Sequence, residues 1–312
     1  MILKGATNKF SNTKHLLFSS DARTAWGHLI ENIGKATEGE LKVLLPSYIG
    51  FTEREGSGVF DPIEQTNSRF DFYKVGENLE VNMEHFETQL KKGDFKVVLI
   101  IHYFGFCRNN IKLIKQLCEK YNVLLVEDCA HAFHLELEKP QLGNKGDYSF
   151  YSLHKYMATD SGGVLQVNNE TIQIDELPAA KKAGLEVLEQ YIKTDFQEIA
   201  KIRRANYSKY FSMLQNHTEM DIMYQLEEDE VPQSFPLRIK NNKREKLYFY
   251  LMEREIPTTA LYYRLIKEIP KEKFPLSYTI SNEILNLPVH QDTTIEDVEV
   301  ICAAISDFWQ QG

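Results

Sequence analysis

The middle of the chain alternates short apolar runs with amphipathic stretches. Five apolar runs predict β-strands, at Lys42–Ser47, Lys96–His102, Val123–Asp128, Tyr148–Leu153 and Gly163–Val167. Several of these runs are apolar throughout rather than at alternate positions, which is typical of strands covered on both faces of a parallel sheet. The stretches between them predict helices at Thr24–Ala36, Met83–Lys92 and Ile111–Tyr121. This alternation of strands and helices indicates an α/β domain with a mostly parallel sheet.

The pattern changes after about residue 180. Residues Leu185–Leu214 have apolar positions at helical spacing and no proline, which predicts one or two long helices. The acidic stretch Leu226–Phe235 then reads as a boundary, and the rest of the chain predicts a small α+β domain. Its helices are expected at Asn242–Glu255 and Ile295–Trp309. We therefore expect a large domain over residues 1–225 and a small carboxyl-terminal domain over residues 226–312.

Composition narrows the functional class. Of the 312 residues, 43% are hydrophobic and 26% are charged, which is ordinary for a soluble globular protein. The formal charge of −9 argues against a partner that is nucleic acid or an anionic membrane, but it leaves room for one local site that binds a small phosphorylated ligand. No apolar run approaches the roughly 18 residues of a membrane span, and the first residues lack the apolar middle of a secretory signal. Because the four cysteines are scattered, we expect reduced thiols and a cytoplasmic enzyme.

The segment Leu125–His134 holds the first candidate chemistry. An apolar strand ends here in Glu127 and Asp128, and ligands of open α/β sheets bind beyond the carboxyl ends of the strands. An aspartate at such a position can equally well cap the next helix. The segment also contains four side chains of types that bind metals, namely Asp128, Cys129, His131 and His134. Their spacing differs from the common zinc patterns, so we expect no metal.

The segment Gly143–Gly163 holds the second group of candidate functional residues. A polar, glycine-rich loop enters an aromatic strand, which leads to Ser152 and Lys155. A lysine at the end of a buried strand can be desolvated, which lowers its pKa and makes it a nucleophile towards an aldehyde. A single lysine is more often a solvated surface residue. The interpretation of Lys155 as a nucleophile therefore depends on its pairing with Asp128, 27 residues earlier.

A third candidate is the segment Phe18–Trp26, where Ser19, Ser20 and Asp21 can cap an amphipathic helix. A helix that begins among small residues can bind a phosphate with its free backbone N–H groups, and Arg23 could add positive charge. An ordinary capped helix is the alternative. The sequence contains neither a phosphate-binding GxxxxGK[ST] loop nor a GxSxG nucleophile motif.

In this order, the three clusters resemble the DegT-type sugar aminotransferases, and the resemblance runs from about Leu17 to the end of the chain. The matching segments are FSSDARTAW (Phe18–Trp26), LLPSY (Leu44–Tyr48), IHYFGF (Ile101–Phe106), VEDCAHAF, SLHKYMATDSGGV and IRRANY (Ile202–Tyr207), with further likeness in FPLRI, IPTTALYY and LNLPVHQDTTIEDV. The resemblance implies the fold-type-I architecture of pyridoxal 5'-phosphate (PLP) enzymes, with a large, mostly parallel domain and a small α+β domain.

It also implies roles for individual residues around PLP. Lys155 is expected to bind PLP as a Schiff base and then to transfer the proton, and Asp128 is expected to pair with the protonated pyridine nitrogen. Further cofactor contacts are expected from the backbone N–H groups of Ala22 and Arg23, the hydroxyl of Ser152, and the rings of His131 and Tyr48.

The chain departs from the family pattern at three places. Phe150 stands where many members have a phosphate-binding serine, so that Ser149 or Ser152 must substitute. Gly50 stands near the place of an aromatic residue, which Tyr48 or Phe51 could replace. The segment after Gly163 lacks the motif with which a partner subunit contacts the phosphate.

The resemblance implies an enzyme, a PLP-dependent aminotransferase. Its substrates would be a keto-sugar, most commonly nucleotide-linked, and an amino-acid donor such as glutamate. It also implies a homodimer. Two alternatives stay open: a PLP enzyme of the same fold that performs dehydration, and a degenerate relative that only binds.

Overall fold

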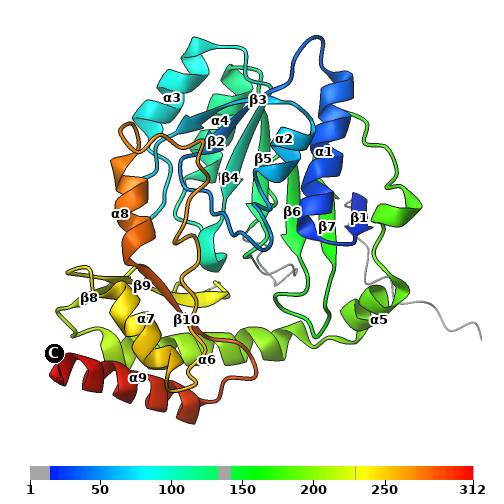
Figure 1. Ribbon diagram of the computed structural model, residues 1–312. Coiled ribbons are helices and arrows are strands. Elements are labelled where there is room, and N and C mark those ends of the chain that lie inside the picture. Colours follow the sequence, from blue (N-terminus) through cyan, green and yellow to red (C-terminus); the bar gives the residue numbers. More distant parts are fainter. Residues whose placement is uncertain (1–14, 133–141, 229, 312) are drawn as a thin grey trace, which may run out of the picture.

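The first half of the chain builds one large sheet in the computed structural model, which describes residues 15–132, 142–228 and 230–311 (Figure 1). The strands of this sheet are β1 (His15–Ser19), β2 (Lys42–Pro46), β3 (Arg69–Tyr73), β4 (Val97–Ile101), β5 (Leu124–Cys129), β6 (Tyr148–Ser152) and β7 (Gly163–Val167). Their order is β1-β7-β6-β5-β4-β2-β3. The strands from β6 to β3 run parallel, whereas β7 is antiparallel to both of its neighbours.

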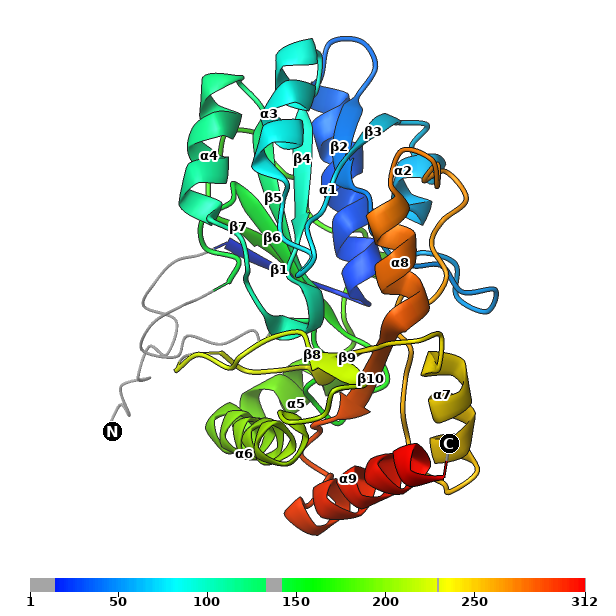
Figure 2. The same cartoon turned by 90° about the vertical axis from the view of Figure 1, so that its left-hand side faces the viewer.

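Helices cover both faces of this sheet, as its continuously apolar strands require. They are α1 (Ala22–Ala36), α2 (Asp61–Gln65), α3 (Met83–Lys92) and α4 (Ile111–Lys120). Figure 2 shows α3 and α4 on one side of the sheet and α1 with α2 on the other. The indole of Trp26 in α1 is fully buried and stacks on Phe150 of β6, with ring centroids 5.4 Å apart. This contact fixes α1 over the strand that leads to Lys155.

Most of the second half of the chain lies below the carboxyl ends of the parallel strands, whereas its helix α8 (Pro275–Glu283) lies beside the large sheet (Figure 1). The second half comprises α5 (Leu185–Lys193), α6 (Phe196–Leu214), β8 (Met220–Ile222), β9 (Ser234–Ile239), α7 (Arg244–Met252), α8, β10 (Ile284–Pro288) and α9 (Ile295–Gln310). The three strands form an antiparallel sheet in the order β10-β9-β8. Strand β8 comes before residue 226 in the chain but pairs with β9 of the small sheet. The division of the chain into residues 1–225 and 226–312 therefore stays a proposal.

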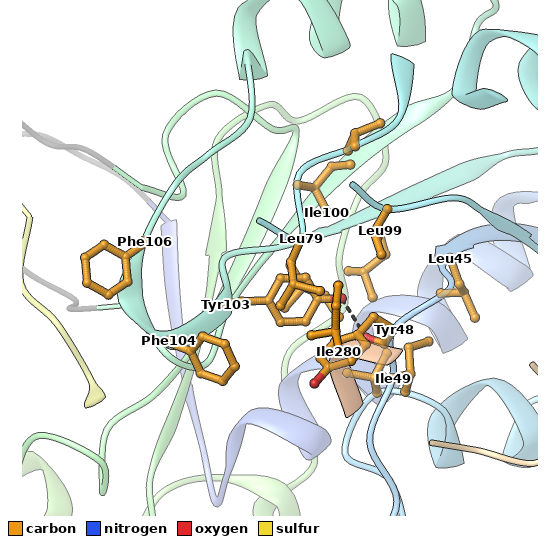
Figure 3. Packing of buried hydrophobic residues seen from close by; sticks show 14 of the residues in the cluster. Leu45, Tyr48, Ile49, Leu79, Leu99, Ile100, Tyr103, Phe104, Phe106 and Ile280 are labelled. Carbon is orange, nitrogen blue, oxygen red and sulfur yellow. Dashed lines mark hydrogen bonds between the residues drawn. The ribbon is translucent and has the colours of Figure 1, made fainter. Parts of the chain in front are cut away.

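A shared apolar core joins the two halves. Ile280 of α8 belongs to the same cluster of buried apolar residues as Leu45, Tyr48 and Tyr103 from the first half, and the Tyr103 hydroxyl donates to the Tyr48 carbonyl at 2.6 Å (Figure 3). The hydroxyl groups of Ser47 and Ser277 also form a hydrogen bond of 3.1 Å across the same junction. The residues around the strand ends are therefore held from both sides.

The predicted α/β class and its mostly parallel sheet are confirmed. All five predicted strands exist, with ends within one residue of their expected positions. The sequence analysis missed the short elements β1, β3, α2, β8 and α8, which lack a long apolar pattern of either period. Within the described parts of the chain, no helix combines the length and apolar character needed to cross a membrane.

Candidate active site

A cavity of about 960 Å³ opens where the two halves of the chain meet. Its lining comes from the start of α1, the ends of β5 and β6, the segment 50–59, and residues between 244 and 264. The cavity brings together six of the seven residues that the sequence analysis selected, namely Ala22, Arg23, Asp128, His131, Ser152 and Lys155. This volume lies within the range of ordinary small-molecule sites.

Asp128 lies near the end of β5 and is only 3% exposed. Its Oδ1 accepts a 2.8 Å hydrogen bond from the Ala130 N–H, and its own carbonyl accepts from the His102 N–H. Burial raises the pKa of Asp128 to about 6, although the Ala130 N–H and the charge of Lys155 act in the opposite direction. A cationic group in the cavity would therefore stabilise this carboxylate.

Lys155 follows β6 in a tight turn and faces the same cavity. Desolvation lowers the pKa of its amine to about 8, while the charges of Asp128 and Glu55 keep the pKa from falling further. An amine with this pKa is partly neutral at physiological pH, and the neutral form is the nucleophile.

The backbone of Lys155 is fixed by Arg203 of α6, a buried residue that the sequence analysis did not select. The guanidinium donates to the Lys155 carbonyl at 2.7 Å and to the Gln291 side chain at 3.0 Å. It also lies 4.3 Å from the centroid of the Tyr156 ring. IRRANY was noted as a family-like motif, but nothing in its spacing connects Arg203 with a lysine 48 residues earlier.

The start of α1 offers a site for an anion. The Asp21 side chain caps the helix by accepting from the Thr24 N–H at 2.7 Å, which leaves the N–H groups of Ala22 and Arg23 without partners inside the helix. The Arg23 guanidinium forms a 3.0 Å ion pair with Asp61, so its charge is already balanced. Arg23 was expected to contribute its side-chain charge and its backbone N–H. The backbone N–H is the stronger candidate for phosphate binding, because the side chain is already paired.

Gly163 explains how the strand end and the helix start come so close together. A Cβ at this residue would overlap Asp21 and come within 2.6 Å of the Ala22 nitrogen. The preceding Gly162 donates its N–H to the Ser20 carbonyl at 2.6 Å. The Gly-Gly pair after the lysine loop therefore allows β7 to pack directly against the proposed phosphate site.

The geometry of β6 distinguishes Ser149 from Ser152, the two serines that could replace the phosphate-binding serine that many family members have at the position of Phe150. Its side chains alternate, so that Phe150 and Ser152 line the cavity. Ser149 lies on the opposite face of the sheet and is fully buried. The structure thus favours Ser152.

His131 forms part of the cavity wall as a neutral ring. Burial lowers its pKa well below the ordinary value, and the charge of Lys155 lowers it further. Its Nδ1 accepts from the Phe104 N–H at 3.3 Å, and its carbonyl accepts from the Tyr156 hydroxyl. The imidazole also stacks on the Phe104 ring, with centroids 6.0 Å apart.

Tyr48, the seventh selected residue, lies behind the cavity wall. It is fully buried, and its ring makes edge contacts with Tyr103 and Tyr262. Tyr262 itself lines the cavity, and so does Phe51. Sequence reasoning did not single out Tyr262, because the segment IPTTALYY lies more than 200 residues from the strand against which it packs.

Among the described residues, no potential metal-binding group combines Asp128, Cys129 and His131. His134 lies outside the described residues. Cys129 belongs instead with His102 and Glu127, three buried residues whose ligand atoms lie within 4.8 Å of one another. The Glu127 carboxylate accepts a 2.7 Å hydrogen bond from His102 Nε2 and further hydrogen bonds from backbone N–H groups of the loop before β6. This geometry is that of a buried ion pair.

Comparison with known proteins gives consistent results. A sequence model of the DegT/DnrJ/EryC1/StrS aminotransferase family matches residues 72–194 and 182–306. The GDP-perosamine synthase of Vibrio cholerae is 24% identical over an alignment that covers 96% of this chain and 88% of that protein.

Two solved structures illustrate the shared fold. The aminotransferase TlmJ from Streptoalloteichus hindustanus has a TM-score of 0.78 at 20% identity, covering 95% of this chain and 86% of its own. The GDP-4-keto-6-deoxymannose-3-dehydratase ColD, solved with GDP-perosamine, has a TM-score of 0.75 at 15% identity, covering 93% and 88%. At these identities the structures establish the fold.

Proposed function

Because the chain belongs to the DegT/DnrJ/EryC1/StrS aminotransferase family, we propose that it is a PLP-dependent enzyme that transfers an amino group to a nucleotide-linked keto-sugar. Glutamate is the proposed amino donor. The observation that carries this proposal is the convergence of Lys155, Asp128 and the start of α1 on one cavity. The likeness to a GDP-perosamine synthase supports a sugar nucleotide as the acceptor class.

The residues of the cavity fit the three polar parts of PLP. The free N–H groups of Ala22 and Arg23, with the Ser152 hydroxyl, suit the phosphate. The partly neutral amine of Lys155 suits the aldehyde, and the buried carboxylate of Asp128 suits a protonated ring nitrogen. The cavity is also large enough to admit a second ligand beside the cofactor.

When bound, PLP supplies an aldehyde that takes up the amine and a protonated ring that withdraws electrons from the substrate carbon. The protein supplies the proton transfers. With a pKa of about 8, Lys155 can accept a proton from carbon and return it, since both of its forms are populated near neutral pH. The Asp128 carboxylate would hold a proton on the ring nitrogen of bound PLP, and the low dielectric around this buried side chain would strengthen the attraction.

Dehydration is the second candidate, because two structural neighbours are sugar dehydratases. The two reactions differ in their products: an aminotransferase leaves nitrogen on the sugar, whereas a dehydratase removes water from it. Mass spectrometry of a sugar nucleotide after a single turnover therefore separates them. The presence of Lys155 and Asp128 in one cavity also argues against a degenerate, purely binding protein.

The first experiment tests the cofactor and its attachment. The purified protein should absorb visible light through lysine-bound PLP, and glutamate should bleach this absorption. Borohydride should attach the cofactor permanently to the peptide that contains Lys155. A Lys155→Ala variant should lose the band, while Lys182→Ala, which removes an exposed lysine, should keep it. Label on another peptide, or an unchanged spectrum of Lys155→Ala, would refute the assignment.

We further propose that the enzyme works in the cytoplasm as a homodimer. All four cysteines are free thiols, as expected for a reducing compartment. The net charge of −9 argues against partners that are nucleic acids or anionic membranes. The homodimer is supported by the exposed apolar side chains of Leu185 and Ile192 on α5.

A further inference from the structure

Gly50 marks an unusual place in the cavity wall. The built Cβ of any other residue at this position would overlap the ring of Tyr262, coming within 2.8 Å of its Cε1 atom. The backbone of Gly50 does not have a left-handed φ, so the local chain conformation does not demand glycine here. Glycine is required at residue 50 because the Tyr262 ring occupies the space that a Cβ would need.

Tyr262 is held in this space from two sides. On one side, the Phe51 N–H donates to the Arg264 carbonyl and the Ile266 N–H donates to the Ile49 carbonyl, both at 3.0 Å. On the other side, the Ser281 hydroxyl of α8 donates to the Tyr262 carbonyl at 2.8 Å. The ring therefore belongs to a segment fastened to both halves of the molecule.

The backbone of Tyr262 is strained as well. Its φ of 61° lies in the left-handed region, which is costly for a residue that carries a Cβ. Such outliers persist where the surrounding structure holds them, and they concentrate at functional sites. Here the strained backbone carries an aromatic side chain into the cavity rather than away from it.

The Tyr262 ring lies among other aromatic side chains at the cavity wall. Its centroid lies 5.8 Å from that of His131, at a 42° tilt, and its edge contacts the ring of Tyr48 behind it. Burial, and after it the charge of Asp128, raises the pKa of Tyr262, so the phenol stays neutral. Tyr262, His131 and Asp128 all line the cavity. An aromatic face, a neutral imidazole and a buried carboxylate thus meet on one stretch of cavity wall.

We propose that Tyr262 provides the aromatic surface against which the PLP ring packs, and that Gly50 is glycine in order to admit it. The proposal rests on the function proposed above. It assigns to a residue of the second half of the chain the role that the sequence analysis gave to Tyr48. Aromatic rings bind planar π-systems through offset or tilted contacts of this kind, in addition to the apolar area that they bury.

The test uses the full-length protein and measures PLP itself. Apoprotein of each variant is titrated with PLP, and binding is followed by visible absorption and by the circular dichroism of the lysine-bound cofactor. Tyr262→Leu should weaken PLP binding about tenfold and diminish the dichroism, because the aromatic surface is lost. Tyr262→Phe should stay within about twofold of wild type, because its ring is kept.

Gly50→Ala provides an independent variant, since its methyl group displaces the Tyr262 ring without altering it. We expect this variant to weaken PLP binding as Tyr262→Leu does. The matched control is Tyr250→Leu, which removes an aromatic ring of α7 that contacts Phe308 outside the cavity lining and should leave PLP binding unchanged. Thermal melting of each apoprotein shows whether the variant is folded.

The outcomes separate this inference from the proposed function. If the wild-type protein fails to bind PLP at Lys155, the proposed function itself is wrong. If the wild type binds PLP while folded Tyr262→Leu and Gly50→Ala bind it with wild-type affinity and dichroism, only the role of Tyr262 is refuted. Should Tyr262→Leu not fold, Gly50→Ala decides the matter alone.

Discussion

At the scale of single residues, the site depends on two buried groups of opposite charge. Burial shifts the pKa of Asp128 up to about 6 and that of Lys155 down to about 8, so each group is closer to neutrality than it would be in water. Each also stabilises the charged form of the other. Their titrations should therefore be visible in cofactor binding as well as in catalysis.

The first prediction concerns the pH dependence of PLP binding. Only the neutral amine of Lys155 reacts with an aldehyde, so the association rate of PLP with apoprotein should rise as the pH approaches about 8 and level off above it. An ordinary lysine would give a rate that is still rising at pH 10. Stopped-flow absorbance measures this rate, and a simple amine with the same PLP serves as the control. A profile without a plateau below pH 10 would contradict the lowered pKa.

The second prediction concerns Asp128→Asn. This variant keeps the size of the side chain and an oxygen that can accept from the Ala130 N–H, but it removes the charge. PLP should still bind, whereas the half-reaction with glutamate should slow more than a hundredfold, corresponding to about 3 kcal/mol. Single-turnover absorbance measures this rate. If Asp128 acts only as a backbone cap, the variant will react almost as fast as wild type.

At the scale of elements, β5 carries neighbouring carboxylates on its two faces. Asp128 faces the cavity, whereas Glu127 faces away from it and organises the loop before β6. The Glu127 carboxylate accepts from the N–H groups of Gly143, Lys145 and Gly146 and from His102 at the end of β4. Burial alone lowers the pKa of His102, but Cys107 and Glu127 beside it raise that pKa to about 10.

The third prediction concerns the buried pair of Glu127 and His102. Glu127→Ala leaves a buried histidine and three backbone donors without their acceptor, so it should lower the free energy of unfolding by about 3–5 kcal/mol at pH 7. Urea unfolding measures the loss, and Glu119→Ala on the exposed face of α4 should change it by less than about 0.5 kcal/mol.

The pH dependence gives a further check on Glu127. Although burial raises its pKa, His102 and the loop N–H groups lower it below the ordinary 4.5. Its contribution is therefore complete above pH 4.5 and is lost as the pH falls through the lower pKa of the folded state. The difference between wild type and Glu127→Ala should shrink in acid, and a difference independent of pH would contradict the assignment.

The elements also show what the sequence could predict. Asp128 and Lys155 were selected because Asp128 ends one strong apolar strand and Lys155 follows another, and strand ends are readable from local pattern. Ser152 was expected to contact the cofactor, with Ser149 as the alternative, and Ser152 is the one of the two that lines the cavity. Tyr262 reaches the cavity through packing against distant segments, which no local pattern records.

At the scale of the whole molecule, the cavity lies between two halves that share one core, and the apolar surface left outside that core is informative. Helix α5 lies at the edge of the molecule, far from the small sheet (Figure 1). Its Leu185 and Ile192 are each 76% exposed, the most exposed of the large apolar side chains that the structure describes. Apolar side chains gathered on one face are typical of a surface that a partner covers.

The last prediction is that this surface of α5 forms part of a two-fold homodimer. In a closed two-fold interface each residue occurs twice, so one added charge per chain places two charges in the contact. Leu185→Glu combined with Ile192→Glu should therefore convert the dimer to a monomer at micromolar concentration, as measured by analytical ultracentrifugation. The control is Val300→Glu, which changes an apolar residue 62% exposed on α9 and should leave the dimer intact. A dimer that survives the double substitution would place the interface elsewhere, whereas a wild-type monomer that still binds PLP would refute the dimer itself.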